Sequence, residues 1–144
     1  MTPPKMPPNT LPYGESITLE AAKRVMAAAE AEAAKQGWPM VIAIVDNAGQ
    51  IVMLTREDQA QKGSVVIAQK KAETAAQFRR STKVFQDGVA GGGAGLRILS
   101  MPNALPMEGG LPIVKDGFVI GGIGVSGMQS DQDAQVAEAG LAAL

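Results

Sequence analysis

The sequence predicts an α+β fold in which helices flank an antiparallel sheet, as a layered α/β/α sandwich. Two β-hairpin patterns carry this prediction: a strand over 40–46 returns over 50–54, and a strand over 113–115 returns over 118–126. Helical patterns precede, separate and follow the hairpins, so helices are available to cover the sheet. The length of 144 residues suits one domain with one core. We therefore divide the chain into a proline-rich N-terminal arm, 1–14, and a single domain, 15–144.

Composition excludes several classes of function. The net charge is −1, so no basic excess is present to neutralise a nucleic-acid backbone, and nucleic acid is not an expected partner. The chain contains no histidine and no cysteine, which excludes a Ser-His-Asp triad, a thiolate nucleophile and the usual zinc sites. No metal site is predicted. Acid–base chemistry would have to use carboxylates, lysines or Tyr13, the only tyrosine.

The first residues show neither a secretory signal nor a membrane span. They lack the apolar segment of a signal peptide, and no run of about 18 apolar residues occurs anywhere. We expect a cytoplasmic protein with no membrane partner; whether it is a fragment of a longer product stays open. Five of the first twelve residues are proline, which predicts an extended arm. The arm is interpreted either as a disordered tail or as a strap on a neighbouring subunit, anchored by Tyr13.

The first helix is expected from Thr18, as its N-cap, to about Gln36, with Gly37 ending it. Its alanine-rich face predicts close packing on the sheet. A second helix is expected from Ser64, as its cap, to roughly Arg80. A short third helix, capped by Ser81 or Thr82, would run through Val89, and the glycine-rich run 91–95 is a candidate hinge, lid or plain linker.

Extended structure is expected to resume at Leu96 and to lead into the second hairpin, whose turn is Asp116-Gly117. A capping box of Ser130 and Asp133 predicts the start of a last helix. The strand over 40–46 is almost continuously apolar, which predicts burial on both of its faces.

Two polar residues have alternative interpretations. Asp46 follows the first buried strand, where it is either an active-site carboxylate or an acceptor for turn amides. Lys71 falls on a stripe of the second helix closer to the core than is usual for lysine. It either extends to solvent along its aliphatic stem, or is buried, where it would have a lowered pKa or hold an anion.

Residues 122–127 match the pattern G-x-G-x-x-G between a strand and a helix. A dinucleotide-binding fold also needs a following parallel strand and an acidic residue about 20 positions on. Only 17 residues follow Gly127, and they indicate one helix. We reject the dinucleotide interpretation; these glycines favour close helix–sheet packing or leave room for a ligand or subunit.

Four segments together resemble the GlcG/HbpS family, also known as the haem-degrading or PduO C-terminal-like family. They are VIAIVDNAGQIV, SVVIAQKKAETAAQF, EGGLPIVKDGFVIGGIGVSG and QDAQVAEAGLAAL, which together span about residues 16–144. The resemblance implies an antiparallel sheet of about five strands, assembly as a homo-oligomer and association with haem or a related tetrapyrrole. It implies no other cofactor. Without histidine or cysteine, an iron ligand would have to come from Tyr13, a methionine, a lysine or water.

The first functional hypothesis is an oligomeric small-ligand-binding protein of the haem-associated type. Lys71 and Arg79 would bind the carboxylates of the ligand, beside the entrance formed by Glu108, Gly109 and Gly110. The full set of predicted ligand-binding residues is Lys71, Arg79, Phe78, Glu108, Gly109, Gly110, Pro112 and Gly127.

Two alternatives remain open. The first is a cofactor-independent isomerase, hydratase or lyase acting on a small oxygenated acid in a catabolic pathway. In it Lys71 and Arg79 hold the substrate, Glu108 or Asp46 transfers a proton, and the Gly109 and Gly110 amides stabilise an oxyanion. The predicted catalytic residues are then Glu108, Asp46 and Lys71. The second alternative is an accessory subunit of an assembly, without chemistry of its own.

Overall fold

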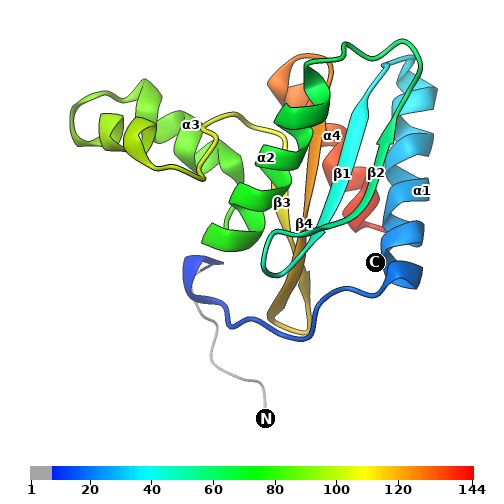
Figure 1. Cartoon of the computed structure of the whole chain (residues 1–144), viewed down its shortest axis with the longest axis horizontal. Helices are drawn as coiled ribbons and strands as arrows, with labels where there is room; N and C mark the ends of the chain where they lie inside the picture. The colour runs from blue at the N-terminus through cyan, green and yellow to red at the C-terminus, as the bar shows by residue number, and fades with distance from the viewer. Residues whose placement is uncertain (1–7) are drawn as a thin grey trace.

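Two antiparallel hairpins build the centre of the molecule, in a computed structural model that describes residues 8–144 (Figure 1). The described elements, in chain order, are the 3₁₀ helix η1 (Pro8–Thr10), α1 (Leu19–Gln36), β1 (Val41–Asp46), β2 (Ile51–Arg56), α2 (Ser64–Phe78), α3 (Thr82–Ala90), the 3₁₀ helix η2 (Gly93–Ser100), β3 (Gly110–Lys115), β4 (Phe118–Ser126) and α4 (Ser130–Leu141). The sheet order is β2-β1-β4-β3, and every strand pair is antiparallel. The predicted α+β class is confirmed.

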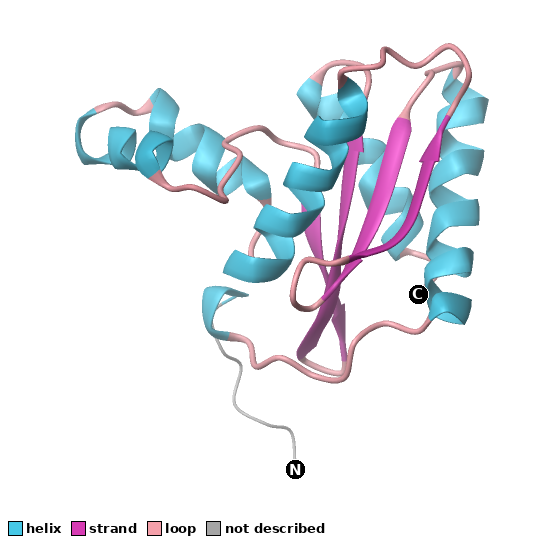
Figure 2. Ribbon diagram, viewed as in Figure 1, coloured by secondary structure: helices cyan, strands magenta, loops and turns pink. Residues whose placement is uncertain are grey.

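Helices cover both faces of this sheet, as Figure 2 shows. The β1 strand alternates between the two layers: Ile42 and Ile44 pack in a core with α1 and α4, whereas Ala43 and Val45 pack in a second core under α2. All five residues from Val41 to Val45 are buried, as the continuous apolar run predicted. The sandwich is therefore α1 and α4, then the sheet, then α2.

The glycines of β4 bring α2 unusually close to the sheet. A methyl group on Gly122 would overlap the carbonyl oxygen of Ala72, and one on Gly124 would overlap that of Ala68. Larger residues at these positions would push the helix away. Close helix–sheet packing is thus what the G-x-G-x-x-G pattern provides, and the rejection of a dinucleotide loop is supported by the antiparallel pairing of β4 with both β1 and β3.

Several predicted helix ends are confirmed. Thr18 accepts a hydrogen bond from the Ala21 amide at the start of α1, and Gly37 ends that helix in the left-handed conformation. Ser81 accepts a bond from the Lys83 amide at the start of α3.

Two predicted caps are wrong by one residue. Gly63 precedes α2, and Ser64 is instead its first residue, buried and hydrogen-bonded to Ser126. At α4 the N-cap is Gln129, whose amide donates to the side chain of Gln132 three residues on. Asp133 instead accepts from the Met128 amide and from Lys71.

The region after α3 differs from the prediction. Instead of extended structure from Leu96, η2 folds back against α3, and the two form a lobe, residues 82–100, that projects from the body (Figure 1). A methyl group on Gly95 would overlap the Gly88 carbonyl, so only glycine permits this approach. The predicted count of about five strands is corrected to four in the described residues. Of the glycine-rich run over 91–95, Gly91 and Gly92 form the turn between α3 and η2, and the remaining residues begin η2.

The N-terminal segment packs against the chain's own body. The Tyr13 hydroxyl donates to the carbonyl oxygens of Ala76 (3.0 Å) and Gln77 (2.8 Å), and the residue bridges to Val119 of β4. Tyr13 is thus an anchor to α2 of the same chain. The part of the arm over 1–7 lies outside the described residues. No helix within residues 8–144 combines the length and apolarity needed to cross a bilayer.

Candidate functional site

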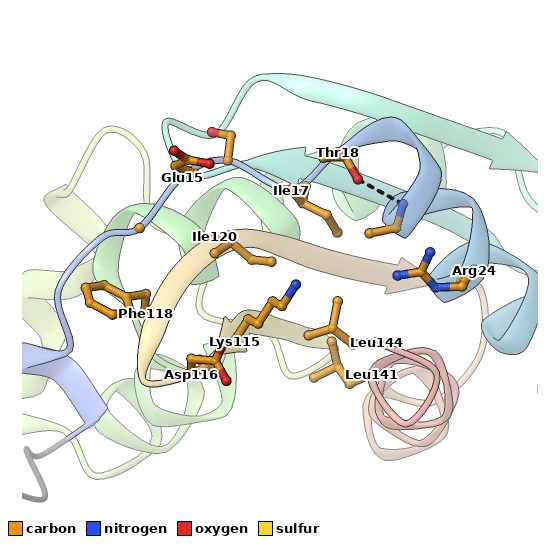
Figure 3. Close-up of a pocket in the computed structure, with 14 residues that line it drawn as sticks. Glu15, Ile17, Thr18, Arg24, Lys115, Asp116, Phe118, Ile120, Leu141 and Leu144 are labelled. Atoms are coloured by element: carbon orange, nitrogen blue, oxygen red, sulfur yellow. Dashed lines mark hydrogen bonds between the residues drawn. The ribbon is translucent and has the colours of Figure 1, made fainter. Parts of the chain in front are cut away.

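A cavity of about 700 Å³ lies at the end of the sheet where the N-terminal segment meets the β3–β4 hairpin (Figure 3). Four parts of the chain form it: residues 14–18, the first turns of α1, the hairpin, and the end of α4. Its lining residues are Gly14, Glu15, Ser16, Ile17, Thr18, Ala21, Arg24, Val114, Lys115, Asp116, Phe118, Ile120, Leu141 and Leu144. Its volume falls in the range of small-molecule sites.

The hairpin turn positions two of the walls. Asp116 and Gly117 both have positive φ, 53° and 83°, as a tight two-residue turn requires. The turn places Lys115 opposite Phe118 in the sheet register. On the facing side, the Ile17 amide donates to the Ile120 carbonyl at 2.8 Å, which fixes residues 14–18 along β4. Local turn chemistry and strand-like contacts between the N-terminal segment and β4 therefore build the cavity.

The cavity is open to solvent, and its lining combines aliphatic side chains with polar and charged ones. Ile17, Ile120, Leu141 and Leu144 supply aliphatic surface that points inward in Figure 3. Phe118 keeps 44% of its surface exposed, so an aromatic face is available to a ligand. A flat apolar group would bury this surface on binding.

Two cationic side chains point into the same cavity from different elements, Arg24 from α1 and Lys115 from β3 (Figure 3). Arg24 lies 3.6 Å from Glu20, a pair in which both side chains are largely exposed. Lys115 takes part in no ion pair within residues 8–144. The acidic Glu15 and Asp116 lie at the rim. The arrangement suits an apolar ligand that carries carboxylates.

The cavity fits part of a haem group. Its apolar walls suit the ring and its cations suit the propionates, but none of its lining residues is a histidine, cysteine, methionine or tyrosine. These four are the usual axial ligands of haem iron. The residues present therefore fit a tetrapyrrole with carboxylates and do not fit iron ligation of the usual kind.

The predicted residue Lys71 is fully buried, which excludes the interpretation that it extends to solvent. Its Nζ donates to Asp133 Oδ2 and to the Val125 carbonyl, both at 2.9 Å. Asp133 Oδ1 accepts from the Met128 amide at 3.0 Å. Lys71 thus does hold an anion, and the anion is a carboxylate of the same chain.

Burial shifts the pKa of Asp133. Removal from water raises the pKa of the Asp133 carboxyl above its ordinary value, although the Lys71 ammonium and its hydrogen bond act in the opposite direction. Through these bonds Lys71 of α2 is joined to β4 and to α4, so the pair connects all three layers of the sandwich.

The predicted entrance is closed over the same lysine. Gly109 has φ of 127°, and a methyl group there would lie 2.8 Å from Lys71 Nζ. The Gly110 amide donates to Thr82 Oγ1 at 2.9 Å, so it is already bonded. The Glu108 amide donates to Gln86, and the carboxylate lies near Lys83, whose pKa is raised first by Asp87 and to a lesser degree by Glu108.

The other predicted residues lie apart from this group. The Arg79 guanidinium donates to the Leu11 carbonyl at 2.9 Å and lies over the Tyr13 ring at 5.4 Å. The ring of Phe78 packs edge to face on Phe85, with centroids 5.3 Å apart. These two side chains organise the N-terminal segment and the base of the lobe.

Asp46 is a turn residue, as one interpretation proposed. Its Oδ1 accepts from the amides of Ala48 and Gln50, both at 2.9 Å. Pro112 lies in the edge strand β3, opposite Gly122, and Gly127 follows β4 with its backbone against the Pro39 carbonyl. The binding and catalytic roles assigned to these residues stay predictions.

The structure thus brings Lys71, Gly109 and Gly110 together, and none of the predicted site residues lines the 700 Å³ cavity. Sequence reasoning missed Arg24 and Lys115. The one available signal was the Asp116-Gly117 turn, which places a lysine directly before a tight hairpin and a phenylalanine directly after it. The approach of residues 14–18 and of α4 has no local signal in the sequence.

Comparison with known proteins gives consistent relatives. The family described as "Haem degrading protein HbpS-like" matches residues 17–142. The chain is 39% identical over 110 residues to Protein GlcG of Escherichia coli, covering 76% of this chain and 81% of GlcG.

Two solved structures share the whole fold. The crystal structure of HbpS is 32% identical, with a TM-score of 0.84, and covers 97% of this chain and 98% of its own. The structure described as a PduOC:heme complex is 30% identical, with a TM-score of 0.81, and the match covers 90% of this chain and 95% of that one.

Proposed function

Because the chain belongs to the HbpS-like family of haem-degrading proteins, we propose that it binds a flat tetrapyrrole ligand of the haem type in the 700 Å³ cavity. The observation that carries this proposal is the pairing of apolar walls with Arg24 and Lys115 in one space. The haem complex described for PduOC, a relative of the same fold, supports the class of ligand.

The chemistry of binding follows from the walls. Ile17, Ile120 and Leu141 exclude water from the faces of the ring, and Phe118 adds aromatic surface. Arg24 and Lys115 form charge-assisted hydrogen bonds with the two carboxylates of the ligand. Because both cations stand near solvent, the carboxylate ends of the ligand would lie toward the opening and the ring toward Ile17 and Ile120.

A titration with hemin tests this function. We expect a saturable change in the Soret band at micromolar protein concentration. The double variant Arg24→Met and Lys115→Met should weaken binding by about tenfold or more, since two charged contacts are lost. Lys23→Met, an exposed change on α1 outside the cavity, is the matched control and should bind like the wild type. Absence of a saturable change in the wild type would rule the function out.

We also propose that copies of this chain assemble through the lobe formed by α3 and η2. Val84, Leu96 and Leu99 are each at least half exposed on it, at 51%, 50% and 63%. No residue of η2 is buried. Apolar surface on a projection is typical of contact with another molecule.

Light scattering coupled to size-exclusion chromatography measures this assembly. We expect a mass of more than one chain for the wild type and a smaller mass for Leu96→Glu combined with Leu99→Glu. The matched control is Val66→Glu, an exposed apolar position on α2 away from the lobe. A monomeric wild type would contradict the proposal.

A further inference from the structure

The cavity has side chains that could bind the ring and carboxylates of a tetrapyrrole, but it lacks the side chains that usually bind the metal at the centre of the ring. The chain has no histidine or cysteine at all, and the cavity is lined by no methionine or tyrosine. The remaining donors of its lining are the Lys115 amine, the carboxylates of Glu15 and Asp116, and the hydroxyls of Ser16 and Thr18. For ligand carboxylates, in contrast, the cavity offers two cations on separate elements, Arg24 and Lys115.

We propose that this chain recognises the ring and carboxylates of a tetrapyrrole and is indifferent to whether a metal occupies its centre. This inference rests on the proposed function and uses the same cavity. It identifies the ligand class as dicarboxylate tetrapyrroles in general, metal-free ones included.

The two cations are available for this role. Lys115 makes no ion pair within the described residues. The contact of Arg24 with Glu20 is 3.6 Å long and joins side chains that are 52% and 89% exposed, so water screens it and a ligand carboxylate can replace it. Both side chains point into the cavity in Figure 3.

Their separation in the fold also matters. Arg24 lies on α1 and Lys115 at the end of β3, and the aliphatic side chains of Ile17, Ile120, Leu141 and Leu144 lie between these elements. The two carboxylates of a haem-type porphyrin leave one edge of its ring. They would meet Arg24 and Lys115 at the opening of the cavity while the ring covers the aliphatic side chains behind them. Such an arrangement gains its affinity at one edge and the faces of the ligand, and not at its centre.

The acidic rim provides the competing explanation. A carboxylate oxygen of Glu15 or Asp116 would be an oxygen ligand for ferric iron. Asp116 is held by its turn, with φ of 53°, and both residues are exposed. If either one binds iron, affinity will depend on the metal and on that carboxylate.

Three probes separate these possibilities: ferric haem, metal-free protoporphyrin IX, and protoporphyrin IX dimethyl ester. Each is titrated into the full chain, and binding is followed by porphyrin absorbance and by the fluorescence of Trp38, the only tryptophan. We expect Kd values for the first two probes within about threefold of each other, and a Kd at least about tenfold weaker for the ester, which lacks the charged contacts. Glu15→Gln combined with Asp116→Asn should not weaken the binding of ferric haem, because neither carboxylate is needed as an iron ligand.

The outcomes are distinct. Binding of ferric haem more than about thirtyfold tighter than that of protoporphyrin, lost in the Glu15 and Asp116 double variant, would overturn the inference while the proposed function stands. Equal binding of the ester and the free acid would also overturn it, because the carboxylates would then not matter. Failure of all three probes to bind would remove the proposed function itself.

Discussion

A buried lysine and its carboxylate hold three layers of this protein together. Lys71 is fully buried, and its ammonium reaches Asp133 of α4 and the Val125 carbonyl of β4. No buried side-chain polar atom of the described residues lacks a hydrogen-bond partner. A fully satisfied pair of this kind is costly to break from one side, since the remaining charge stays buried without its partner.

Removal of the lysine alone should be strongly destabilising. We expect Lys71→Met to lower the free energy of unfolding by about 3–5 kcal/mol, because Asp133 is left charged and buried. The double variant Lys71→Met and Asp133→Leu should recover much of this loss, since no charge remains in the interior. Urea unfolding followed by circular dichroism measures both. A double variant no more stable than the single one would show that the loss comes from disturbed packing and not from an unpaired buried charge.

The pair also predicts the sign of a pH effect. Burial raises the pKa of Asp133 above its ordinary value of 3.8, so the folded protein binds this proton at pH values where the unfolded chain has released it. The contribution of Asp133 to stability therefore falls as the pH rises from 3.8 through the raised folded pKa.

The measurement is the difference in unfolding free energy between the wild type and Asp133→Asn, taken between roughly pH 3 and pH 6. We expect this difference to fall as the pH rises. A difference that grows with pH would mean that the Lys71 ammonium outweighs burial and holds the carboxyl pKa low.

The contacts of single residues could be predicted where the partner is close in the sequence, and not where it is far away. The cap of Thr18 and the turn contacts of Asp46 could be predicted, because each side chain bonds an amide within four residues. The partner of Lys71 could not, since Asp133 lies 62 positions away and only the folded chain brings them together.

At the scale of elements, the approach of α2 to the sheet depends on missing side chains. Gly122 and Gly124 of β4 lie directly beneath the backbone carbonyls of that helix. The helix contributes small residues of its own, Ala68, Ala72 and Ala76, all fully buried. Two backbones therefore pack with little between them, and this layer tolerates no added volume.

A methyl group added at Gly124 should force α2 outward. We expect Gly124→Ala to lower the free energy of unfolding by about 1–3 kcal/mol through overpacking. The control is Gly63→Ala just before α2, where the new methyl group would meet no atom within 4 Å and φ is −61°, so stability should be unchanged. Chemical denaturation of both variants gives the comparison, and equal midpoints for Gly124→Ala and the wild type would contradict this account of the layer.

At the scale of the whole molecule, the order of elements could be predicted and the path of one segment could not. Hairpin turns and helical periodicity are local signals, and they indicated the two hairpins and the helices around them. The lobe could not be predicted because η2 depends on a contact between Gly88 and Gly95, which the periodicity of the sequence does not reveal. The cavity could not be predicted because four separate parts of the chain meet there.

The N-terminal segment is the part of the whole that joins this cavity to α2. The Tyr13 hydroxyl bonds two carbonyls at the end of α2, and residues 14–18 continue as a cavity wall. We expect Tyr13→Phe to lower the free energy of unfolding by about 1 kcal/mol and to weaken hemin binding, because the wall loses its attachment. Arg97→Met, an exposed change on η2, is the control for both measurements. Unaltered hemin affinity in Tyr13→Phe would show that residues 14–18 keep their position in the cavity without the hydrogen bonds of Tyr13.

The lobe has a consequence for protein engineering. At its start, Thr82 accepts a hydrogen bond from the Gly110 amide, and just after its end Asn103 and Leu105 bond Thr74 of α2. No residue of η2, in contrast, is buried. A shortened version, with a tight turn in place of the tip, would keep the same sheet and the same cavity. Folding and the proposed contact with other copies of the chain would then depend on separate segments, and η2 could be redesigned without a change in the sheet.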